Sequence, residues 1–353
     1  MKSGFYKGLK AEVSEYLEVH GIRPKADWIL WTKFLVSLAC LLGSYLALMT
    51  LDLNAAQAWV VGLVLSLSIC FFFVNSMHDM VHGALTENRF LRDVFPYILD
   101  WIGPSSFIWR NKHNRSHHFH TNHPGIDNDL NVSILLRFSP HHPRMAFHRF
   151  QAFYITLAYC LQTLFWFYVT DFKNILRGKI TKQKLLGQTS AENWLFVINK
   201  GIHITLALVI PSQVHGFQSA ALGYLVVYGL ASLLLALIFQ VAHVFEGAKF
   251  HTIERFEDQD QWAKSQIEGT CVFDPASKFA LWVYGGLNLQ VVHHLFPEIA
   301  HTHYYKIFPI IRKHCQENGI ELHCFESFSA ALKSHYRQLH RLGTGQANGD
   351  LYA

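Results

Sequence analysis

The chain has 353 residues, of which 51% are hydrophobic and only 16% are charged. Soluble globular proteins carry about 25% charged residues, so this chain lacks the polar side chains that would cover a water-facing surface. Its 28 Phe, 14 Tyr and 9 Trp exclude a disordered, collagen-like or small disulfide-bonded protein. The 23 His almost equal the 25 Asp and Glu together. The composition therefore predicts an integral membrane protein with a histidine-rich site.

The charged and sulfur-containing residues exclude further classes. The net charge is only +5, and Lys and Arg form no single basic block, so no nucleic-acid partner is expected. The six cysteines form no Cys-x-x-Cys pair, and we interpret them as reduced packing residues. Residues 1–28 are mixed and charged, without an early apolar stretch, so no cleavable signal peptide is expected.

Uncharged apolar runs predict four membrane-spanning helices in an all-α fold. The predicted spans cover about residues 31–51, 58–77, 195–212 and 218–241. Each run reaches or approaches the length of about 20 apolar residues that a bilayer requires. A cytoplasmic N-terminal arm, residues 1–30, precedes them, and a flexible tail is expected over residues 343–353.

A fifth apolar run, about residues 150–170, is predicted to lie at the membrane interface. The loops 52–57 and 211–218 contain no Lys or Arg, whereas the N-terminal arm and residues 173–184 contain several. The excess of positive charge places the arm and that segment in the cytoplasm. Because two spans precede the fifth run, it must then begin and end on the same side. If it were a fifth span, the histidine clusters would be divided between the two faces.

Three histidine clusters and one further histidine lie near the predicted span ends, all in a predicted helical cytoplasmic cap. These groups are His78 and His82; His113, His117 and His118; His243; and Gln290, His293 and His294. Spacings of three or four residues put the members of a cluster on one helix face, where they can reach one metal ion. A single pair of this kind is often only a hydrogen-bonded surface feature, but three clusters on one side predict a metal site.

The ligand types indicate which metals and which chemistry to expect. Imidazoles suit Zn, Cu, Fe or Ni, whereas Mg and Ca prefer oxygen ligands. Eight histidines and one glutamine exceed the needs of one ion, so two metal ions are expected. A nitrogen-rich metal pair beside an apolar slot suits oxygen activation and attack on an unactivated C–H bond. A di-zinc membrane hydrolase is an alternative, although an evident bridging carboxylate is missing. A transition-metal transporter is a more remote one, because few polar residues lie inside the spans.

Four motifs stand in a fixed order along the chain. They are His78-Asp79-x-x-His82, Trp109-x-x-Lys112-His113-Asn114-x-x-His117-His118, Thr121-Asn122-x-x-Gly125-x-Asp127-x-Asp129 and Gln290-x-x-His293-His294-Leu295-Phe296-Pro297. Their order and spacing resemble the membrane fatty acyl desaturases. The similarity is greatest to the front-end (delta-6-like) branch, in which the third histidine motif begins with Gln. The resemblance extends from about Trp31 to Gly343.

The resemblance implies an O2-dependent oxidoreductase that introduces a double bond into a fatty acyl chain. It implies two iron ions held by His78, His82, His113, His117, His118, His243, His293 and His294. Gln290 takes a weaker ligand position or supports the ligands. Four polar residues near the motifs are expected to orient the imidazoles, or else to form caps and turns: Asp79, Asn114, Asp127 and Asp129. A narrow tunnel for the acyl chain is predicted to be lined by Phe107, Trp109, Trp282 and Tyr284.

Two departures from the family pattern bear on partners. Val292 stands where the family usually has an acidic residue, so recognition of the substrate or the electron donor is expected to differ there. The only string like the haem motif of a fused cytochrome b5 domain is His123-Pro124-Gly125-Ile126. Electrons are therefore expected from a separate ferredoxin or cytochrome b5.

The substrate carrier and the reaction outcome stay open at this point. The acyl group would be carried on CoA, on a lipid or on acyl carrier protein. The active site is expected to face the cytoplasm, with a bacterial inner membrane favoured over the endoplasmic reticulum. A hydroxylase or an alkyne-forming acetylenase on the same scaffold is the alternative, because the outcome depends on substrate placement that no motif reports.

Overall fold

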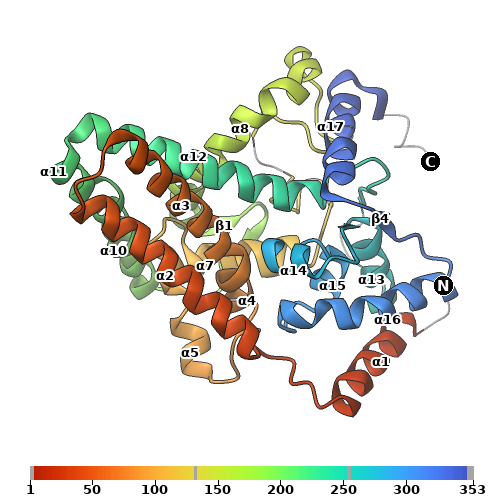
Figure 1. Ribbon diagram of the computed structural model, residues 1–353. Coiled ribbons are helices and arrows are strands. Elements are labelled where there is room, and N and C mark those ends of the chain that lie inside the picture. The colour runs from red at the N-terminus through yellow and green to blue at the C-terminus, as the bar shows by residue number, and fades with distance from the viewer. Residues whose placement is uncertain (1–3, 131–132, 253–255, 348–353) are drawn as a thin grey trace. The chain divides into compact units, whose positions relative to one another are not determined.

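The computed structural model describes residues 4–130, 133–252 and 256–347, and helices make up most of their regular structure (Figure 1). By its internal contacts the chain divides into two compact units. Unit 1 comprises Met1–Asp27, Lys112–Thr156 and Leu237–Ala353, and unit 2 comprises Trp28–Asn111 and Leu157–Ala236. The expected all-α membrane fold is confirmed.

Short strands occur only as pairs in the described part of the chain. β1 (Lys179–Ile180) and β2 (Gln183–Lys184) form an antiparallel hairpin. β3 (Cys271–Phe273) and β4 (His323–Phe325) pair in parallel, with Cys271 opposite His323. Each strand is two or three residues long, so these pairs fix loops and form no separate sheet layer.

Among the residues that the structure describes, five helical stretches are long and apolar enough to cross a membrane. They are Trp28–Thr50 (α2), Ala55–Val81, Ala146–Arg177, Ser190–His215 and Phe217–Val241 (α12). Three of these stretches contain turns of a pitch other than that of the α-helix. Ala55–Val81 consists of α3 (Ala55–Phe72), η1 (Phe73–Met77) and α4 (His78–Val81), and Ser190–His215 consists of α10 (Ser190–Ile204), η5 (Thr205–Val209) and α11 (Ile210–His215). Ala146–Arg177 consists of η3 (Ala146–Phe150), α8 (Gln151–Phe165), η4 (Trp166–Thr170) and α9 (Asp171–Arg177). Four of the five stretches coincide with the predicted spans.

The stretch Ala146–Arg177 contains the run that the charge pattern places at the membrane interface. It has 32 residues, so its length and composition also admit it as a span. Its interfacial position therefore stays a prediction.

The helices of unit 2 expose apolar side chains. Leu35 and Leu46 of α2 are 60% and 55% exposed, and Trp59 and Val60 of α3 are 58% and 61% exposed. Large apolar side chains presented along whole helices are typical of contact with lipid. The turn between α2 and α3 is closed by a capping box, in which Asn54 Oδ1 accepts from Gln57 N and Gln57 Oε1 accepts from Asn54 N. Shorter helices complete the unit: α5 (Arg89–Val94), α6 (Tyr97–Asp100) and α7 (Ser106–Arg110).

Unit 1 packs amphipathic helices around its own hydrophobic core. Its helices include α1 (Phe5–Val19), α13 (Gln259–Glu268), α14 (Lys278–Tyr284), α15 (Gln290–Leu295), η6 (His301–His303), α16 (Tyr304–Glu317) and α17 (Phe328–Thr344). Leu9 and Val13 of the N-terminal helix pack in one cluster with Val291, Ile307 and Ile311. The predicted N-terminal arm therefore contains a packed helix.

The last helix, α17, ends at Thr344 and so includes the first two residues of the expected flexible tail. Gly343 is buried in α17, and a Cβ atom built there would lie 2.1 Å from the carbonyl oxygen of His148. Only glycine permits this close approach of α17 to η3. Residues 348–353 of the predicted tail lie outside the described residues.

Candidate metal centre

A π-helix presents the second histidine cluster. η2 (Asn111–His117) has π geometry, and the N–H of His118 donates to the carbonyl of His113 at 3.0 Å, five residues back. Such turns are rare and often mark functional sites. The wider turn brings His113 Nε2 to 3.3 Å from His118 Nε2, and it stacks the rings of His113 and His117 at 5.4 Å. The local helix thus has a longer period than the α-helix that we expected.

His117, His243 and His294, called here the His243 triad, are buried in unit 1. One ring nitrogen from each lies within 4.8 Å of the others. The Nδ1 atoms face oxygen: that of His117 lies 3.1 Å from Asp127 Oδ1, and that of His243 lies 3.4 Å from the carbonyl of Gly269. His294 Nδ1 lies 3.0 Å from Thr121 Oγ1. An imidazole that donates from Nδ1 presents its Nε2 lone pair to a metal, which is how proteins fix metal-binding histidines.

Gln290 adds an amide to the His243 triad. Its Nε2 lies 2.9 Å from His243 Nε2 and 3.4 Å from His294 Nε2. Its Oε1 is buried without a hydrogen-bond partner among the residues that the structure describes. A buried amide oxygen without a partner costs free energy, and a bound cation would remove that cost. Three imidazole nitrogens suit a transition-metal ion, and Gln290 brings its amide beside two of them.

A second group in unit 1 consists of His118, His293 and His294, and it shares His294 with the triad. His293 Nδ1 lies 3.2 Å from the hydroxyl of Tyr304, which begins α16. The indole N–H of Trp262 donates to the carbonyl of His118 at 3.3 Å. The rings of His118 and His293 lie 4.6 Å apart, and those of His113 and His293 lie 5.9 Å apart. Unit 1 therefore brings together all of its own predicted ligands.

The remaining predicted ligands, His78 and His82, belong to unit 2. They lie one α-helical turn apart, directly after the π-turn η1, and their ring centroids are 5.0 Å apart. The ring of His78 is 5.9 Å from that of Trp109, which also contacts Phe73 at 4.8 Å. This pair faces one side of its helix, as the spacing predicts.

Carboxylates and one lysine set the charge around His117. Burial works against protonation of His117, but Asp127 and Asp129 outweigh it and raise its pKa. Burial also works against ionisation of Asp129, yet Lys112, 2.6 Å away, and His117 lower its pKa to about 2. For His243, burial and then the charge of His117 lower the pKa to about 3. His243 is therefore neutral at physiological pH, which is the form that binds a metal.

The four predicted supporting residues have different environments. Asp127 bonds His117 and accepts from the N–H groups of Asn122 and Asp129 at 2.9 Å each. Asp129 pairs with Lys112 and lies 3.6 Å from His117 Nδ1. Asn114 is half-buried in η2, and Asp79 is buried in α4 of unit 2.

Three further residues hold the centre, and no role was predicted for them. Thr121 Oγ1 and the side-chain amide of Gln266 both contact His294 Nδ1, at 3.0 Å and 2.9 Å. Asn122 adopts the left-handed region at φ 57° and donates to the carbonyls of His243 and Gly269. Thr121 and Asn122 belong to the sequence motif Thr121–Asp129, so their position in that motif could have indicated a role at the site. No sequence pattern indicated a role for Gln266 of α13.

The predicted tunnel residues lie in both units. Phe107 and Trp109 are buried in unit 2, where Phe107 packs with Ile175 and Phe196. In unit 1, Tyr284 packs against Phe273 and Phe328, and Trp282 is 41% exposed on α14. The lining of a tunnel by these four residues stays a prediction.

Comparisons with known proteins agree with this architecture. The family model described as fatty acid desaturase matches residues 54–326. The sn-1 linoleoyl-lipid 6-desaturase of Synechocystis sp. is 31% identical over 97% of this chain and 96% of its own length. The acyl-lipid (8-3)-desaturase of Physcomitrium patens is 32% identical over 96% of this chain and 72% of its own length. The sn-1 linoleoyl-lipid 6-desaturase of Arthrospira platensis is 29% identical over 96% of this chain. The chain thus belongs to the fatty acid desaturase family and is a membrane oxidoreductase that desaturates fatty acyl chains.

Proposed function

We propose that this desaturase uses two iron ions and O2 to introduce a double bond towards the carboxyl end of an acyl chain carried on a membrane lipid. The His243 triad is the observation that carries the proposal, because three buried imidazoles bring one nitrogen each within 4.8 Å of the others while their Nδ1 atoms face Asp127, Thr121 and the carbonyl of Gly269. Two of the relatives are named as a linoleoyl-lipid and an acyl-lipid desaturase, which supports a lipid-bound substrate.

The donor set fits iron at both positions. One ion would be held by the His243 triad with Gln290 in reach, and the other by His113, His118 and His293. We further propose that His78 and His82 complete the second ligand set; the order and spacing of the histidine motifs support this step. Borderline metals with nitrogen ligands are a stable combination in proteins.

Iron, when bound, would supply the oxidising power that removes two hydrogens from adjacent methylenes, while O2, two electrons and two further protons end as two water molecules. The chain itself holds the ligands in place. Asp127 fixes the ring of His117, and Thr121 with Gln266 fixes that of His294. The complete burial of these groups keeps bulk water from competing with the acyl chain.

The two electrons would come from a separate ferredoxin or cytochrome b5 on the cytoplasmic side. The positive charge of the N-terminal segment and of residues 173–184 supports that orientation. A bacterial inner membrane is the proposed location. A hydroxylase or acetylenase outcome on the same scaffold is decided by the position of the acyl chain against the metals.

Acyl profiling of an expression host tests the proposal. The full chain is expressed with a ferredoxin or a cytochrome b5 system in a host that supplies linoleoyl lipids, and the fatty acids of each lipid class are identified by mass spectrometry. We expect a new double bond in a lipid-bound acyl chain under O2, its loss in His294→Ala, and its retention in His215→Ala. A hydroxylated or triple-bonded product would replace the proposed outcome by an alternative. Oxygen-independent release of fatty acid would contradict it.

A further inference from the structure

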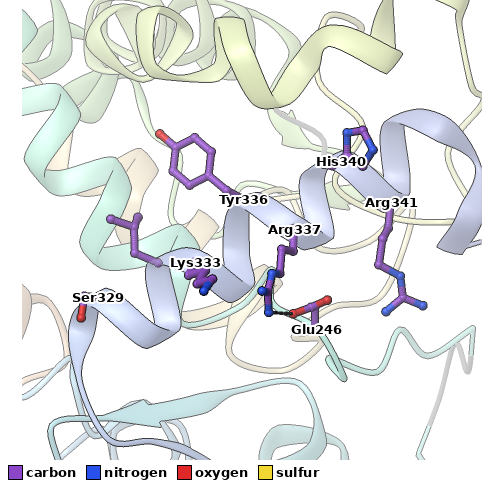
Figure 2. A pocket seen from close by; sticks show the side chains of 8 residues that line it. Glu246, Ser329, Lys333, Tyr336, Arg337, His340 and Arg341 are labelled. Atoms are coloured by element: carbon purple, nitrogen blue, oxygen red, sulfur yellow. Dashed lines mark ion pairs between the residues drawn. The ribbon is translucent and has the colours of Figure 1, made fainter.

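A basic groove runs along the exposed face of α17 in unit 1. It has a volume of about 590 Å³, and Figure 2 shows its side chains. Four basic residues line it: Lys333, Arg337, His340 and Arg341. The single acidic residue there is Glu246, whose carboxylate lies 3.8 Å from Arg337. α17 itself contains no Asp or Glu, so the groove keeps an excess of positive charge.

The three strongest bases form one stripe. Lys333, Arg337 and Arg341 follow one another at intervals of four residues, which places them on one side of the helix. Lys333 and Arg337 are exposed, so their charges are available to a ligand. Guanidinium groups present paired N–H donors that match phosphate oxygens. The stripe therefore suits a phosphate group.

An apolar surface of the same unit adjoins the groove. The hydroxyl of Tyr336 lies 2.8 Å from that of Thr156 in α8, which joins the groove to the long apolar stretch Ala146–Arg177. At the start of that stretch, Phe150 is 50% and Phe153 is 81% exposed, and Arg149 lies over the ring of Phe150 at 4.6 Å. Exposed Phe rings beside a basic side chain suit a helix that lies at the boundary between head groups and acyl chains.

We propose that the groove on α17 binds the phosphate of an anionic membrane lipid, whose acyl chains lie along Phe150 and Phe153. The charge stripe and the apolar surface together favour this occupant. An acidic protein would match the charges, but it would leave the aromatic residues at the start of a membrane-associated helix unexplained. This lipid is separate from the acyl substrate, so the inference goes beyond the proposed reaction.

The groove is also connected to the metal centre through the backbone. Ser334 Oγ accepts from the N–H of Glu246 at 2.9 Å, and His335 Nδ1 donates to the carbonyl of Val244 at 2.6 Å. Val244 directly follows His243 in the chain, and Glu246 stands three residues after it. A lipid held on α17 therefore stabilises the helix that fixes this segment, and its binding should raise the thermal stability of the full chain.

Retention of lipid by the purified full-length protein tests the proposal. Protein stripped of lipid is mixed with phosphatidylglycerol and phosphatidylcholine at a ratio of about 1:3, and the bound lipids are counted by mass spectrometry. The test variant is K333Q/R337Q/R341Q. The matched control K7Q/K10Q/R312Q removes the same charge from exposed positions of α1 and α16. The conservative variant K333R/R337K/R341K keeps every charge.

We expect the wild type, the control and the conservative variant to enrich phosphatidylglycerol at least about tenfold. The test variant should lose that enrichment, because each basic residue near an anionic surface contributes about fivefold. Phosphatidylglycerol should also raise the melting temperature of the wild type and leave that of the test variant unchanged. If the test variant does not fold, the single exposed substitution Lys333→Gln should lower the enrichment about fivefold.

Three outcomes would overturn the proposal. Undiminished enrichment in the test variant would show that the lipid binds elsewhere. An equal loss in the control would show a general charge effect. Unchanged lipid retention together with a raised KM for the protein electron donor alone would assign the groove to that donor.

Discussion

The buried His203 of unit 2 and the buried His243 triad of unit 1 differ in the partners of their second ring nitrogen. His203 of α10 and His294 of α15 are equally inaccessible, each 0% exposed. His203 uses both nitrogens within unit 2: Nδ1 lies 3.1 Å from the carbonyl of Trp101, and Nε2 lies 3.1 Å from the hydroxyl of Tyr224. In the His243 triad the Nδ1 atoms face a side chain or carbonyl, and one ring nitrogen from each residue lies within 4.8 Å of the others. Convergence, and not burial, therefore marks a metal-binding histidine.

His203 and the His243 triad also differ in the side chains that surround them. His203 lies among the aromatic rings of Phe167, Tyr224 and Tyr228. His117 of the triad lies beside Asp127 and Asp129, with Lys112 balancing their charge. An aromatic environment suits a neutral structural ring. A carboxylate that accepts from Nδ1 raises the basicity of the opposite nitrogen and so strengthens a metal bond.

The largest expected effect comes from removing a converging nitrogen. We expect His294→Ala and His243→Ala to lose bound iron and to lower activity by more than the roughly 100-fold that loss of a supporting group causes. His203→Gln should keep its iron, because both nitrogens of His203 already face partners within unit 2. Iron per chain and product formation in membranes of equal protein content are the measurements.

The same three variants can contradict the distinction between converging and merely buried histidines. Full iron content in His294→Ala would remove this residue from the ligand set. Loss of iron in His203→Gln, with unchanged melting temperature, would show that burial alone had been a sufficient guide.

A smaller effect is expected from removing a partner of Nδ1. Asp127→Asn leaves the ring of His117 in place but weakens its acceptor, and we expect iron affinity to fall about 10- to 100-fold. Tyr224→Phe is the matched change in unit 2, because it removes the hydroxyl that bonds His203. It should leave iron affinity unchanged. Iron release to a chelator, followed over time, measures both, and equal release rates would contradict the distinction.

Much of the fold could be predicted because it follows from local composition. The apolar runs that predict α2 and α12 are limited by charge or by histidine at their ends, and a bilayer needs a fixed length. The run at residues 150–170 shows the limit of this reasoning, since the structure gives one stretch, Ala146–Arg177, that composition also admits as a span. Composition gives the length and the polarity of a helix, but it does not tell whether the helix crosses the membrane or lies along its surface.

The candidate site was predictable where spacing along one helix decides contact. His78 and His82 share a helix face because their spacing equals one turn. The contact of His118 with His113 depends on a π-turn, which no residue type in Asn111–His117 announces. Gln266 reaches His294 from a different helix, 28 residues earlier, so only tertiary packing brings it there. Residues that support a ligand from another element leave no periodic signal.

The smallest effect that we predict concerns a third kind of buried histidine, which supports the His243 segment without belonging to it. Burial lowers the pKa of His335 from its ordinary 6.5 to about 4, against the opposing bond to the carbonyl of Val244. Between these two values the unfolded chain takes up a proton that the folded chain excludes. The contribution of the neutral His335 ring to the free energy of unfolding is therefore complete above pH 6.5. It is lost as the pH falls towards 4, and the free energy of unfolding decreases by about 3 kcal/mol at most.

His335→Asn places an amide N–H near the position of Nδ1 and removes the titration. We expect its melting temperature to fall less between pH 7 and pH 5 than that of the wild type, by a few degrees. Other histidines whose pKa burial lowers, including the half-buried His251 and the buried His303, titrate in both proteins, so the difference between the two curves isolates His335. Parallel curves would mean that His335 takes up its proton without unfolding the chain. The bond to Val244 would then tolerate a charged ring, and the His243 segment would be held by Asn122 and Ser334 instead.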